Sequence, residues 1–426
     1  MYFRFMNDYL KIFKWLLIFF GIFLIQSCSI KNQIIKEFNN EKIHPYFSGL
    51  MVYNPQTKQN IITYNSDKFF TPASTVKLFT LYTSLHYLKD SIATVAYFET
   101  DDTLYLQPLA DPSFLHDSLP NKTYNFLAQT DKKIVLIPDI FEDFIYGNGW
   151  QWDDFQYYYM PEKSIFPIYG NVVLSKGKNI IPAFFKDSLS ETTQEEMFRD
   201  FFKNQFYYNP VQTRSIKKIP FKTSLSLSIQ LLSDTIHKPI YKKTYSSEIK
   251  LKPYISSPTK PLYSRLMNES ENFMAEQLFL IISKEKTNEY KVENTIQLAL
   301  DSLFVKIPQF PRWVDASGLS RYNLFTPHDM VYLLDLLQHK YGQKNAMDFL
   351  PKNGEKGAIQ KWYPSKNTYL YAKTGSVSNN HNLCGYIITK KGTFLIFSYM
   401  NNNFMSKSSD VREKMNQILL KIYNTY

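Results

Sequence analysis

The spacing of hydrophobic and polar residues differs between the two ends of the chain and its middle. Near the N-terminal end, Phe47–Tyr53 and Ile61–Tyr64 are apolar and aromatic runs separated by turn-forming residues, which predicts two strands. Thr71 and Pro72 then predict the start of a helix that continues to about Tyr87, with Thr71 as its N-cap and proline at the first helical position.

The middle of the chain has a different pattern, in which short strand-like runs alternate with polar stretches and Pro or Gly breaks. Leu104–Leu109, Lys133–Ile137 and Ser224–Leu231 are runs of this kind. Thr192–Phe206 is an exception, because its spacing fits a helix. We therefore predict an inserted, strand-rich domain at residues 91–259.

Helical spacing returns after residue 260, and three strand-like runs follow near the end of the chain. The last segment has a stripe of apolar residues with helical spacing, which predicts a terminal helix that faces a core. The fold class we expect is α/β (α+β), with an antiparallel sheet flanked by helices and built from residues 28–90 and 260–426. The predicted helices are Pro261–Lys286, Val292–Leu303 and Pro327–His339, and the strands are Tyr369–Lys373, Leu383–Ile388 and Thr393–Met400.

The N-terminus has the pattern of an export signal. Basic residues precede a short apolar run, Trp15–Ile25, which predicts a secretory signal peptide at residues 1–27. The ending of this segment resembles a bacterial lipobox, although Gln26 is unusual there, and the resemblance implies that Cys28 is lipidated. The expected location is the cell envelope, as a periplasm-facing lipoprotein anchored to a bacterial membrane. The alternative is an uncleaved signal anchor with Cys28 incidental.

Composition and charge narrow the function classes. The chain has 426 residues, 44% of them hydrophobic, which is enough for two or three domains. The net charge of +11 favours anionic surfaces, but the lysines are scattered, so we expect no nucleic-acid partner. With two cysteines no disulfide framework is expected, and Cys384 is predicted to be a small buried hydrophobe. The histidines show no zinc-ligand spacing, and we expect neither a metal nor an organic cofactor.

The first candidate for chemistry is Ser74-Thr75-Val76-Lys77 at the predicted helix start. Serine and lysine three residues apart share one face of a helix. A serine hydroxyl is a poor nucleophile unless a base lies within hydrogen-bond reach, and a lysine serves as that base when burial lowers its pKa. By itself this pattern is weak evidence, because it occurs by chance in long chains.

Two further motifs follow in the chain. Ser270-Glu271-Asn272 lies between helical segments, and Lys373-Thr374-Gly375-Ser376 lies at the end of a predicted strand, where it offers an ammonium, hydroxyls and a closely approaching backbone. Each is weak alone. The three motifs in this order, each in its required context, form the signature of penicillin-binding proteins and serine β-lactamases.

More specifically, the chain resembles the class C low-molecular-mass penicillin-binding proteins over most of its length after residue 45. Four further segments carry the resemblance: Asp111–Phe114, Gly149–Asp154, Arg265–Gln277 and Asp315–Arg321. The chain departs from the family pattern at two turns. The glycines that precede the first of these segments in the family are absent, and Ala316 stands where the family has glycine.

The resemblance implies a role for each motif residue in catalysis. Ser74 attacks the carbonyl of the penultimate D-alanine, and Lys77 is the base. Ser270 relays the proton to the leaving amine, Asn272 holds Lys77 and the substrate backbone, and Lys373 supplies positive potential.

The same resemblance implies a substrate-binding group of Thr374, Gly375 and Ser376. The hydroxyls of Thr374 and Ser376 bind the substrate carboxylate, and the backbone N–H groups of Ser74 and Ser376 form an oxyanion hole. Outside the motifs, Asp315 and Ser317 are predicted to build a tight turn, with a direct contact to the site as the alternative.

Three functions remain open at this level. The first is a serine-type D-alanyl-D-alanine carboxypeptidase or endopeptidase that acts on peptidoglycan stem peptides and is acylated by β-lactam antibiotics. The second is a serine β-lactamase, which requires a water-activating group that we do not find. The third is an inactive wall-binding lipoprotein, and the complete motif set argues against it. Near the third motif, His381 is predicted to be an incidental surface residue, with a place at the rim of the cleft as the alternative. Three further residues are assigned to packing of the inserted domain or to the cleft wall: Asp111, Trp150 and Asp153.

Overall fold

The computed structural model describes most of the chain, which divides into two compact units. The first unit contains the chain up to Thr75 together with Ile307–Pro311 and Leu324–Tyr426, and the second contains Val76–Lys306 and Arg312–Asn323. The predicted signal peptide and the predicted lipidation site, Cys28, lie outside the described residues. The described residues are 30–40, 46–194, 197–211, 215–244, 250–355, 358–365 and 367–426.

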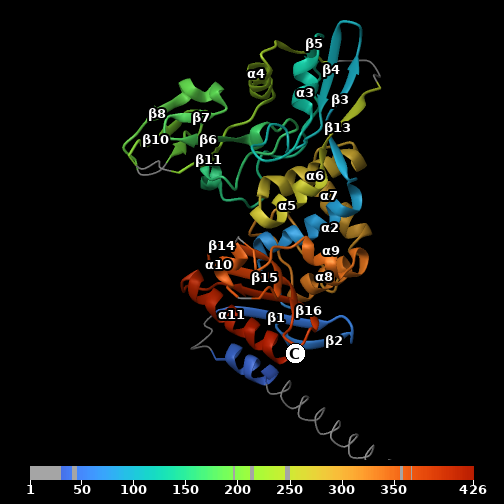
Figure 1. The fold of residues 1–426 in the computed structure, drawn as a ribbon, viewed down its shortest axis with the longest axis vertical. Coiled ribbons are helices and arrows are strands. Elements are labelled where there is room, and N and C mark those ends of the chain that lie inside the picture. The colour runs from blue at the N-terminus through green and yellow to red at the C-terminus, as the bar shows by residue number, and fades with distance from the viewer. Residues whose placement is uncertain are drawn as a thin grey trace, which may run out of the picture. The chain divides into compact units, whose positions relative to one another are not determined.

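A five-stranded antiparallel sheet lies at the centre of the first unit, with the strand order β14-β15-β16-β1-β2 (Figure 1). The order places N-terminal strands beside C-terminal ones. Leu50 in β1 lies opposite Tyr399 in β16, and Lys373 in β14 lies opposite Cys384 in β15. The strands are β1 Phe47–Asn54, β2 Gln59–Tyr64, β14 Leu370–Val377, β15 Asn380–Ile388 and β16 Phe394–Asn402.

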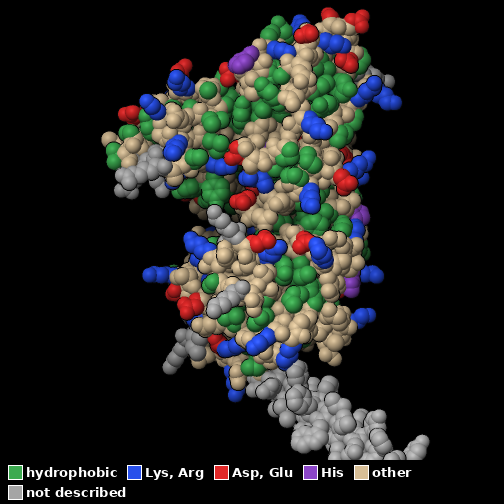
Figure 2. Space-filling model, in the orientation of Figure 1, with side chains coloured by type: hydrophobic (Ala, Val, Ile, Leu, Met, Phe, Trp, Pro, Cys, Tyr) green, Lys and Arg blue, Asp and Glu red, His purple; other side chains and the backbone are tan. Residues whose placement is uncertain are grey.

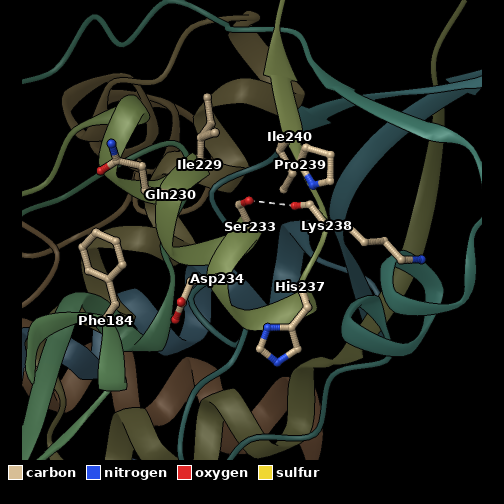
Figure 3. Close-up of a pocket in the computed structure, with 9 residues that line it drawn as sticks. All are labelled: Phe184, Ile229, Gln230, Ser233, Asp234, His237, Lys238, Pro239 and Ile240. Atoms are coloured by element: carbon tan, nitrogen blue, oxygen red, sulfur yellow. Dashed lines mark hydrogen bonds between the residues drawn. The ribbon is translucent and has the colours of Figure 1, made fainter.

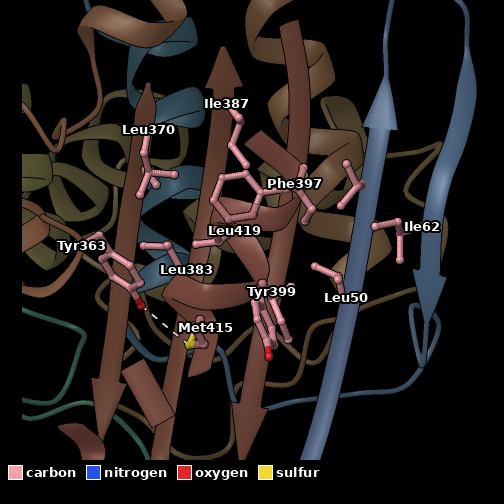
Figure 4. Packing of buried hydrophobic residues seen from close by; sticks show 14 of the residues in the cluster. Leu50, Ile62, Tyr363, Leu370, Leu383, Ile387, Phe397, Tyr399, Met415 and Leu419 are labelled. Atoms are coloured by element: carbon pink, nitrogen blue, oxygen red, sulfur yellow. Dashed lines mark hydrogen bonds between the residues drawn. The ribbon is translucent and has the colours of Figure 1, made fainter. Parts of the chain in front are cut away.

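Helices cover both faces of this sheet. Alternate residues of a strand point to opposite faces, so both faces carry buried side chains. On one face, Phe397 and Tyr399 pack with Met415 and Leu419 of α11 (Figure 4). On the other, the Tyr386 hydroxyl donates a hydrogen bond to a carbonyl of α8 at 2.9 Å. The predicted antiparallel sheet flanked by helices is thereby confirmed. The helices are residues 30–38, α8 Pro327–Tyr341, α9 Gln343–Asp348, α10 Ala358–Trp362 and α11 Ser408–Thr425.

Aromatic contacts join the helices of the second unit. The ring of Phe79 in α2 lies 5.0 Å from Phe304 and 5.6 Å from Trp313, and Phe279 in α6 lies 5.6 Å from the same Trp313. Tilted and edge-to-face ring pairs of this kind add to the stabilisation from burial, so they hold α2 against α6. The helices are α2 Lys77–Tyr87, α5 Thr259–Ser264, a π-helical turn Arg265–Glu269, α6 Asn272–Thr287 and α7 Val292–Ser302.

The stretch predicted as an insertion, residues 91–259, lies entirely within the second unit and contains three small sheets. Their strand orders are β12-β5-β4-β3-β13, β11-β6-β7 and β8-β10-β9, and α3 (Thr123–Gln129) and α4 (Leu225–Ile236) accompany them. One apolar core connects these elements. The strands are β3 Ser91–Glu99, β4 Thr103–Pro108, β5 Lys133–Leu136, β6 Val172–Lys176, β7 Asn179–Ile181, β8 Leu189–Glu191, β9 Phe198–Arg199, β10 Phe206–Tyr208, β11 Lys217–Pro220, β12 Ile240–Lys242 and β13 Lys252–Pro258.

Two predictions within this stretch are wrong. Ser224–Leu231, predicted as a strand, forms most of α4, in which Ser224 caps the helix by accepting the Leu227 N–H at 3.1 Å. Leu225, Leu227, Ile229 and Leu231 alternate with polar residues, but the buried positions Ser228, Leu231, Leu232 and Ile236 follow helical spacing. The predicted helix Thr192–Phe206 is wrong as well, because its described part contains the short strand β9 and a turn. There the Asp200 carboxylate accepts two backbone N–H groups and forms a turn.

The surface charges, the apolar composition of the helices and the second cysteine each bear on a prediction from the sequence. Figure 2 shows lysine and arginine side chains distributed over the visible face without a continuous basic stripe. In the described ranges, no helix combines the length and the apolar composition that spanning a bilayer requires. Cys384 is fully buried, which confirms its predicted role as a small core residue.

The core of the first unit predicts a stability difference between two methionines. Met415 is fully buried in the contact between α11 and the sheet, while Met405 is 93% exposed. Met415→Ala is expected to lower the free energy of unfolding by about 2–5 kcal/mol, because it leaves a cavity. Met405→Ala makes the same chemical change and is expected to alter it by less than about 0.5 kcal/mol. Urea unfolding followed by circular dichroism measures both, and equal effects would contradict the packing described.

Candidate active site

The Ser-x-x-Lys motif crosses from the first unit to the second. Ser74 lies in a 3₁₀ turn, Ala73–Val76, and Lys77 is the first residue of α2. The predicted helix start at Thr71 and Pro72 is therefore wrong, and Ala73 adopts a left-handed backbone with φ of 50°. The physical reason lies in the sheet of the first unit, which holds residues 71 and 72 in place.

Two asparagines on that sheet fix the chain before Ser74. The Thr71 N–H donates to Asn402 Oδ1 at 2.6 Å. Asn382 Nδ2 donates to the carbonyls of Thr71 and Pro72, each at 2.9 Å. Both asparagines are buried, so these bonds are shielded from water. As a result, the turn that carries Ser74 is attached directly to β15 and β16.

Gly375 of the third motif packs against the same turn. A Cβ atom at residue 375 would lie 2.4 Å from the Pro72 carbonyl oxygen, 2.8 Å from the Thr75 nitrogen and 3.0 Å from the Ser74 nitrogen. These neighbours are backbone atoms that cannot rotate away, so only glycine allows this approach. Ser74 and the Lys373–Ser376 strand segment are thereby brought together within one unit.

The other residues of the third motif are held by β14 and its neighbours. Lys373 is buried and donates to the Thr374 carbonyl at 2.9 Å. Ser376 Oγ lies 2.6 Å from His381 Nδ1, and His381 Nε2 lies 2.9 Å from the Tyr363 hydroxyl. The expectation that His381 is a surface residue is wrong, because it is 1% exposed. Burial, together with the charge of Arg412, lowers the pKa of His381 to about 3, so the ring is neutral when it meets Ser376.

Lys77 lies at the centre of a buried group in the second unit. Its side chain is fully buried, and Nζ donates to Asn272 Oδ1 and to the Ser317 carbonyl, both at 2.6 Å. Burial lowers the pKa of Lys77 to about 7, although the charges of Asp315, Glu276 and Glu271 act in the opposite direction. A substantial fraction of the amine is therefore unprotonated at neutral pH, as a general base requires.

The second motif lies where the π-helical turn meets α6. Ser270 has a left-handed backbone with φ of 57°, and this reversal ends the π-helical turn one residue before the N-cap of α6. Asn272 is held from both sides, since its Oδ1 receives Lys77 and its Nδ2 donates to the Tyr159 carbonyl at 2.9 Å. The predicted contact between Asn272 and Lys77 is confirmed.

Glu271, between these two residues, belongs to an ion-pair group. Its carboxylate lies 2.7 Å from Arg265 Nε and 3.4 Å from His116 Nε2. Burial alone would raise the pKa of Glu271, but the hydrogen bonds and charges of His116 and Arg265 outweigh it and lower the pKa to about 2. Glu271 therefore stays ionised and fixes the chain on either side of Ser270.

The Asp315–Ser317 segment forms the tight turn that the sequence predicts. The Asp315 carboxylate accepts the backbone N–H groups of Gly318 at 2.8 Å and Ser320 at 2.6 Å. It also accepts the indole N–H of Trp150 at 2.8 Å, which ties the tryptophan-rich segment to this turn. Asp111 is buried in a separate network with Thr94, Ser113 and Asn121, in agreement with a packing role.

Sequence reasoning missed several groups around Lys77. The Ser317 carbonyl, which accepts from Lys77, and the Tyr159 carbonyl, which accepts from Asn272, are backbone groups and carry no residue-type signal. Glu276 was also missed, although it follows Asn272 by four residues and so shares its helix face. The four-residue spacing from Asn272 could have indicated that Glu276 lies near Lys77.

A hollow of about 630 Å³ lies elsewhere in the second unit (Figure 3). It is lined by Phe184 and by the C-terminal part of α4 and the residues after it, where Ser233 Oγ donates to the Lys238 carbonyl at 2.7 Å. None of the motif residues lines it. In the described ranges, no group of three or more His, Cys, Asp or Glu side chains has the arrangement of a metal site.

The predicted site residues are divided between the two units. The first unit contains Ser74, Lys373, Thr374, Gly375 and Ser376, and the second contains Lys77, Ser270 and Asn272. Within the first unit Gly375 packs against the turn that carries Ser74, and within the second unit Lys77 donates to Asn272. The two groups join covalently at the peptide bond between Thr75 and Val76. Their joint action on one substrate stays a prediction.

Comparison with known proteins agrees with this arrangement. The chain is 23% identical over 446 aligned residues to D-alanyl-D-alanine carboxypeptidase DacB from Haemophilus influenzae, covering 88% of this chain and 90% of that protein. It is also 27% identical over 158 residues to carboxypeptidase DacB from Mycolicibacterium smegmatis, covering 35% of this chain and 34% of that protein.

Solved structures show the same fold. Penicillin-binding protein 4 from Haemophilus influenzae superposes with a TM-score of 0.74 at 20% identity, covering 89% of this chain and 96% of that chain. The same protein in complex with a β-lactam gives a TM-score of 0.69 at 18% identity, with the same coverage. The expected penicillin-recognising fold class is confirmed.

The family model described as the D-Ala-D-Ala carboxypeptidase 3 (S13) family matches residues 30–180 and 221–422, which is well over half of the chain. The order and context of the three motifs, the buried Lys77 and the fold all agree with that match. The chain belongs to the D-Ala-D-Ala carboxypeptidase 3 (S13) family.

Proposed function

We propose that Ser74 is the nucleophile of this serine-type D-alanyl-D-alanine carboxypeptidase/endopeptidase and that Lys77 is its base. The observation that carries the proposal is the buried Lys77 amine, held at 2.6 Å by both Asn272 and the Ser317 carbonyl. The amine begins α2 three residues after Ser74, where a short helical turn gives both side chains a common face.

Acylation then proceeds by a balanced transfer. Ser74 Oγ forms a bond to the carbonyl carbon of the penultimate D-alanine while its proton passes to Lys77 Nζ. The C–N bond of the substrate breaks as the leaving nitrogen receives a proton through the Ser270 hydroxyl. Water subsequently cleaves the ester, which releases the shortened peptide and restores the serine O–H.

The first unit supplies groups that bind the substrate and its developing charge. The backbone N–H groups of Ser74 and Ser376 serve as the oxyanion hole, and the contact of Gly375 with the Ser74 turn supports this role. Lys373 and the Thr374 and Ser376 hydroxyls bind the terminal carboxylate of the substrate. His381 orients the Ser376 hydroxyl as a neutral ring.

The substrate is the stem peptide of peptidoglycan. Carboxypeptidase and endopeptidase action differ only in the leaving group, which is free D-alanine in one case and a cross-linked stem peptide in the other. β-Lactams acylate the same serine, and the Haemophilus influenzae protein with this fold was solved in complex with one.

The location we propose is the bacterial cell envelope, where the peptide substrate lies. Lipidation of Cys28 after cleavage behind Ser27 anchors the protein to a membrane. The basic start, the short apolar run and the lipobox-like ending support this proposal.

Ser74→Ala is expected to abolish labelling by a fluorescent penicillin and to reduce cleavage of soluble muropeptides by on the order of 10⁶-fold, because no hydroxyl remains to form the ester. Mass mapping of the labelled wild-type peptide identifies the modified residue. Ser409→Ala, a serine change on the exposed start of α11, serves as the control and should label normally. Persistent labelling of a folded Ser74→Ala protein would refute the nucleophile assignment.

The acylation rate is expected to fall in acid. Only the neutral amine of Lys77 accepts the serine proton, and its pKa is lowered to about 7. Below that pH the rate should fall about tenfold per pH unit, and above it the rate should level off. Stopped-flow measurement of penicillin acylation across pH provides the test. A rate that keeps rising to pH 10 would show that Lys77 has an ordinary lysine pKa.

The lipid anchor predicts a specific modification. In cells fed an alkyne fatty acid, the wild-type protein should carry the label and its mature N-terminal peptide should begin at Cys28. Cys28→Ala should lose the label completely, while Cys384→Ala, at the other cysteine, should keep it. Recovery of an N-terminal peptide that still contains residues 1–27 would favour the uncleaved signal anchor.

A further inference from the structure

Glu276 is a buried carboxyl group that the reaction scheme leaves without a role. It lies in α6, one turn after Asn272, and its side chain is fully buried. Oε1 accepts the Ser317 N–H at 2.8 Å. Oε2 has no hydrogen-bond partner among the described residues. An ionised carboxylate in such a place loses its hydration without full compensation, so the site favours the protonated form.

The contacts of Glu276 lead directly to Lys77. Ser317 donates its N–H to Glu276 and accepts the Lys77 ammonium with its carbonyl at 2.6 Å. The second acceptor of Lys77, Asn272, lies on the same face of α6 as Glu276. One helix face and one residue of the Asp315–Ser317 turn therefore fix both acceptors of the amine.

The charged groups around Glu276 and Lys77 form a small set. Asp315 repels a charge on Glu276, whereas Lys163, paired with Asp143 at 2.8 Å, attracts it. Burial and Asp315 together raise the pKa of Glu276 to about 7, which is also the value to which the pKa of Lys77 is lowered.

Glu271 also acts on Lys77, but Glu271 stays ionised through its contacts with His116 and Arg265. Glu276 is thus a buried carboxyl group whose charge changes in the same pH range as that of Lys77. An ionised Glu276 favours the ammonium form of Lys77, and a protonated Glu276 favours the free amine.

We propose that Glu276 is a positioning residue for Lys77, which holds the Ser317 backbone against the amine and carries a proton in the state in which Lys77 is a free base. This inference rests on the proposed role of Lys77 in acylation. The Lys77 amine and the Glu276 carboxyl hold one proton between them. When that proton is on Glu276, Lys77 is uncharged and accepts the proton of Ser74. Glu276 touches neither substrate nor Ser74 in this scheme.

The test is the pH dependence of penicillin acylation in the full-length protein, measured by stopped flow between about pH 5 and pH 9. Glu276→Gln keeps an oxygen for the Ser317 N–H but cannot become negative. The midpoint of its acid limb should therefore move down by about one pH unit, because Lys77 no longer faces a carboxylate. A purely structural role would change the plateau rate and leave the midpoint where it is.

Two variants serve as controls. Glu276→Asp keeps the titrating carboxyl but shortens the reach to Ser317, so its midpoint should stay near the wild-type value while its plateau falls. Asp111→Asn makes the same carboxyl-to-amide change at an equally buried position in the same unit, in a separate network with Thr94, Ser113 and Asn121. Its midpoint should equal that of the wild type.

The outcomes separate this inference from the proposed function. Failure of the wild type to be acylated overturns the function. A normal wild-type profile with an unmoved or upward-shifted midpoint in Glu276→Gln overturns only the role of Glu276. If Glu276→Gln does not fold, ¹³C NMR of wild-type protein labelled at glutamate Cδ decides. A resonance that titrates near neutral pH and is missing from Glu276→Asp supports the inference, and its absence from the wild type refutes it.

Discussion

The burial of the Lys77 amine is the constraint on which the site depends. An ammonium removed from water requires acceptors on every side, and a free amine requires surroundings that do not force a charge upon it. The structure offers Asn272 and the Ser317 carbonyl as acceptors, each at 2.6 Å, while burial favours the uncharged amine by lowering the pKa of Lys77 to about 7. Everything that fixes those two acceptors, including the π-helical turn before α6 and the Asp315 turn, acts on the reactivity of the amine.

The first unit fixes the position of Ser74 through its sheet. The side-chain amides of Asn382 and Asn402 hold the backbone before Ser74, and Gly375 packs against the same turn. β14 continues through the Lys373–Ser376 segment, so the strand that supports the turn also carries the third motif.

Much of this could be read from the sequence, and the exceptions have physical causes. The motif residues and the strands β1, β2, β15 and β16 were predictable because apolar spacing and residue order record them directly. The start of α2 was not, since Thr71 and Pro72 are held by asparagines over 300 residues away in the chain. In Ser224–Leu231 the apolar residues alternate as in a strand, yet the residues that are buried follow the spacing of a helix. Ser317 acts through its backbone carbonyl, which no residue type reveals.

Gly375 has a consequence for drug resistance. Selection under an acylating antibiotic favours substitutions that disturb the drug and spare the substrate. At this position every side chain would collide with the peptide units of Ser74 and its neighbours, so a substitution would displace Ser74 itself. An escape variant must therefore arise at a residue other than this one.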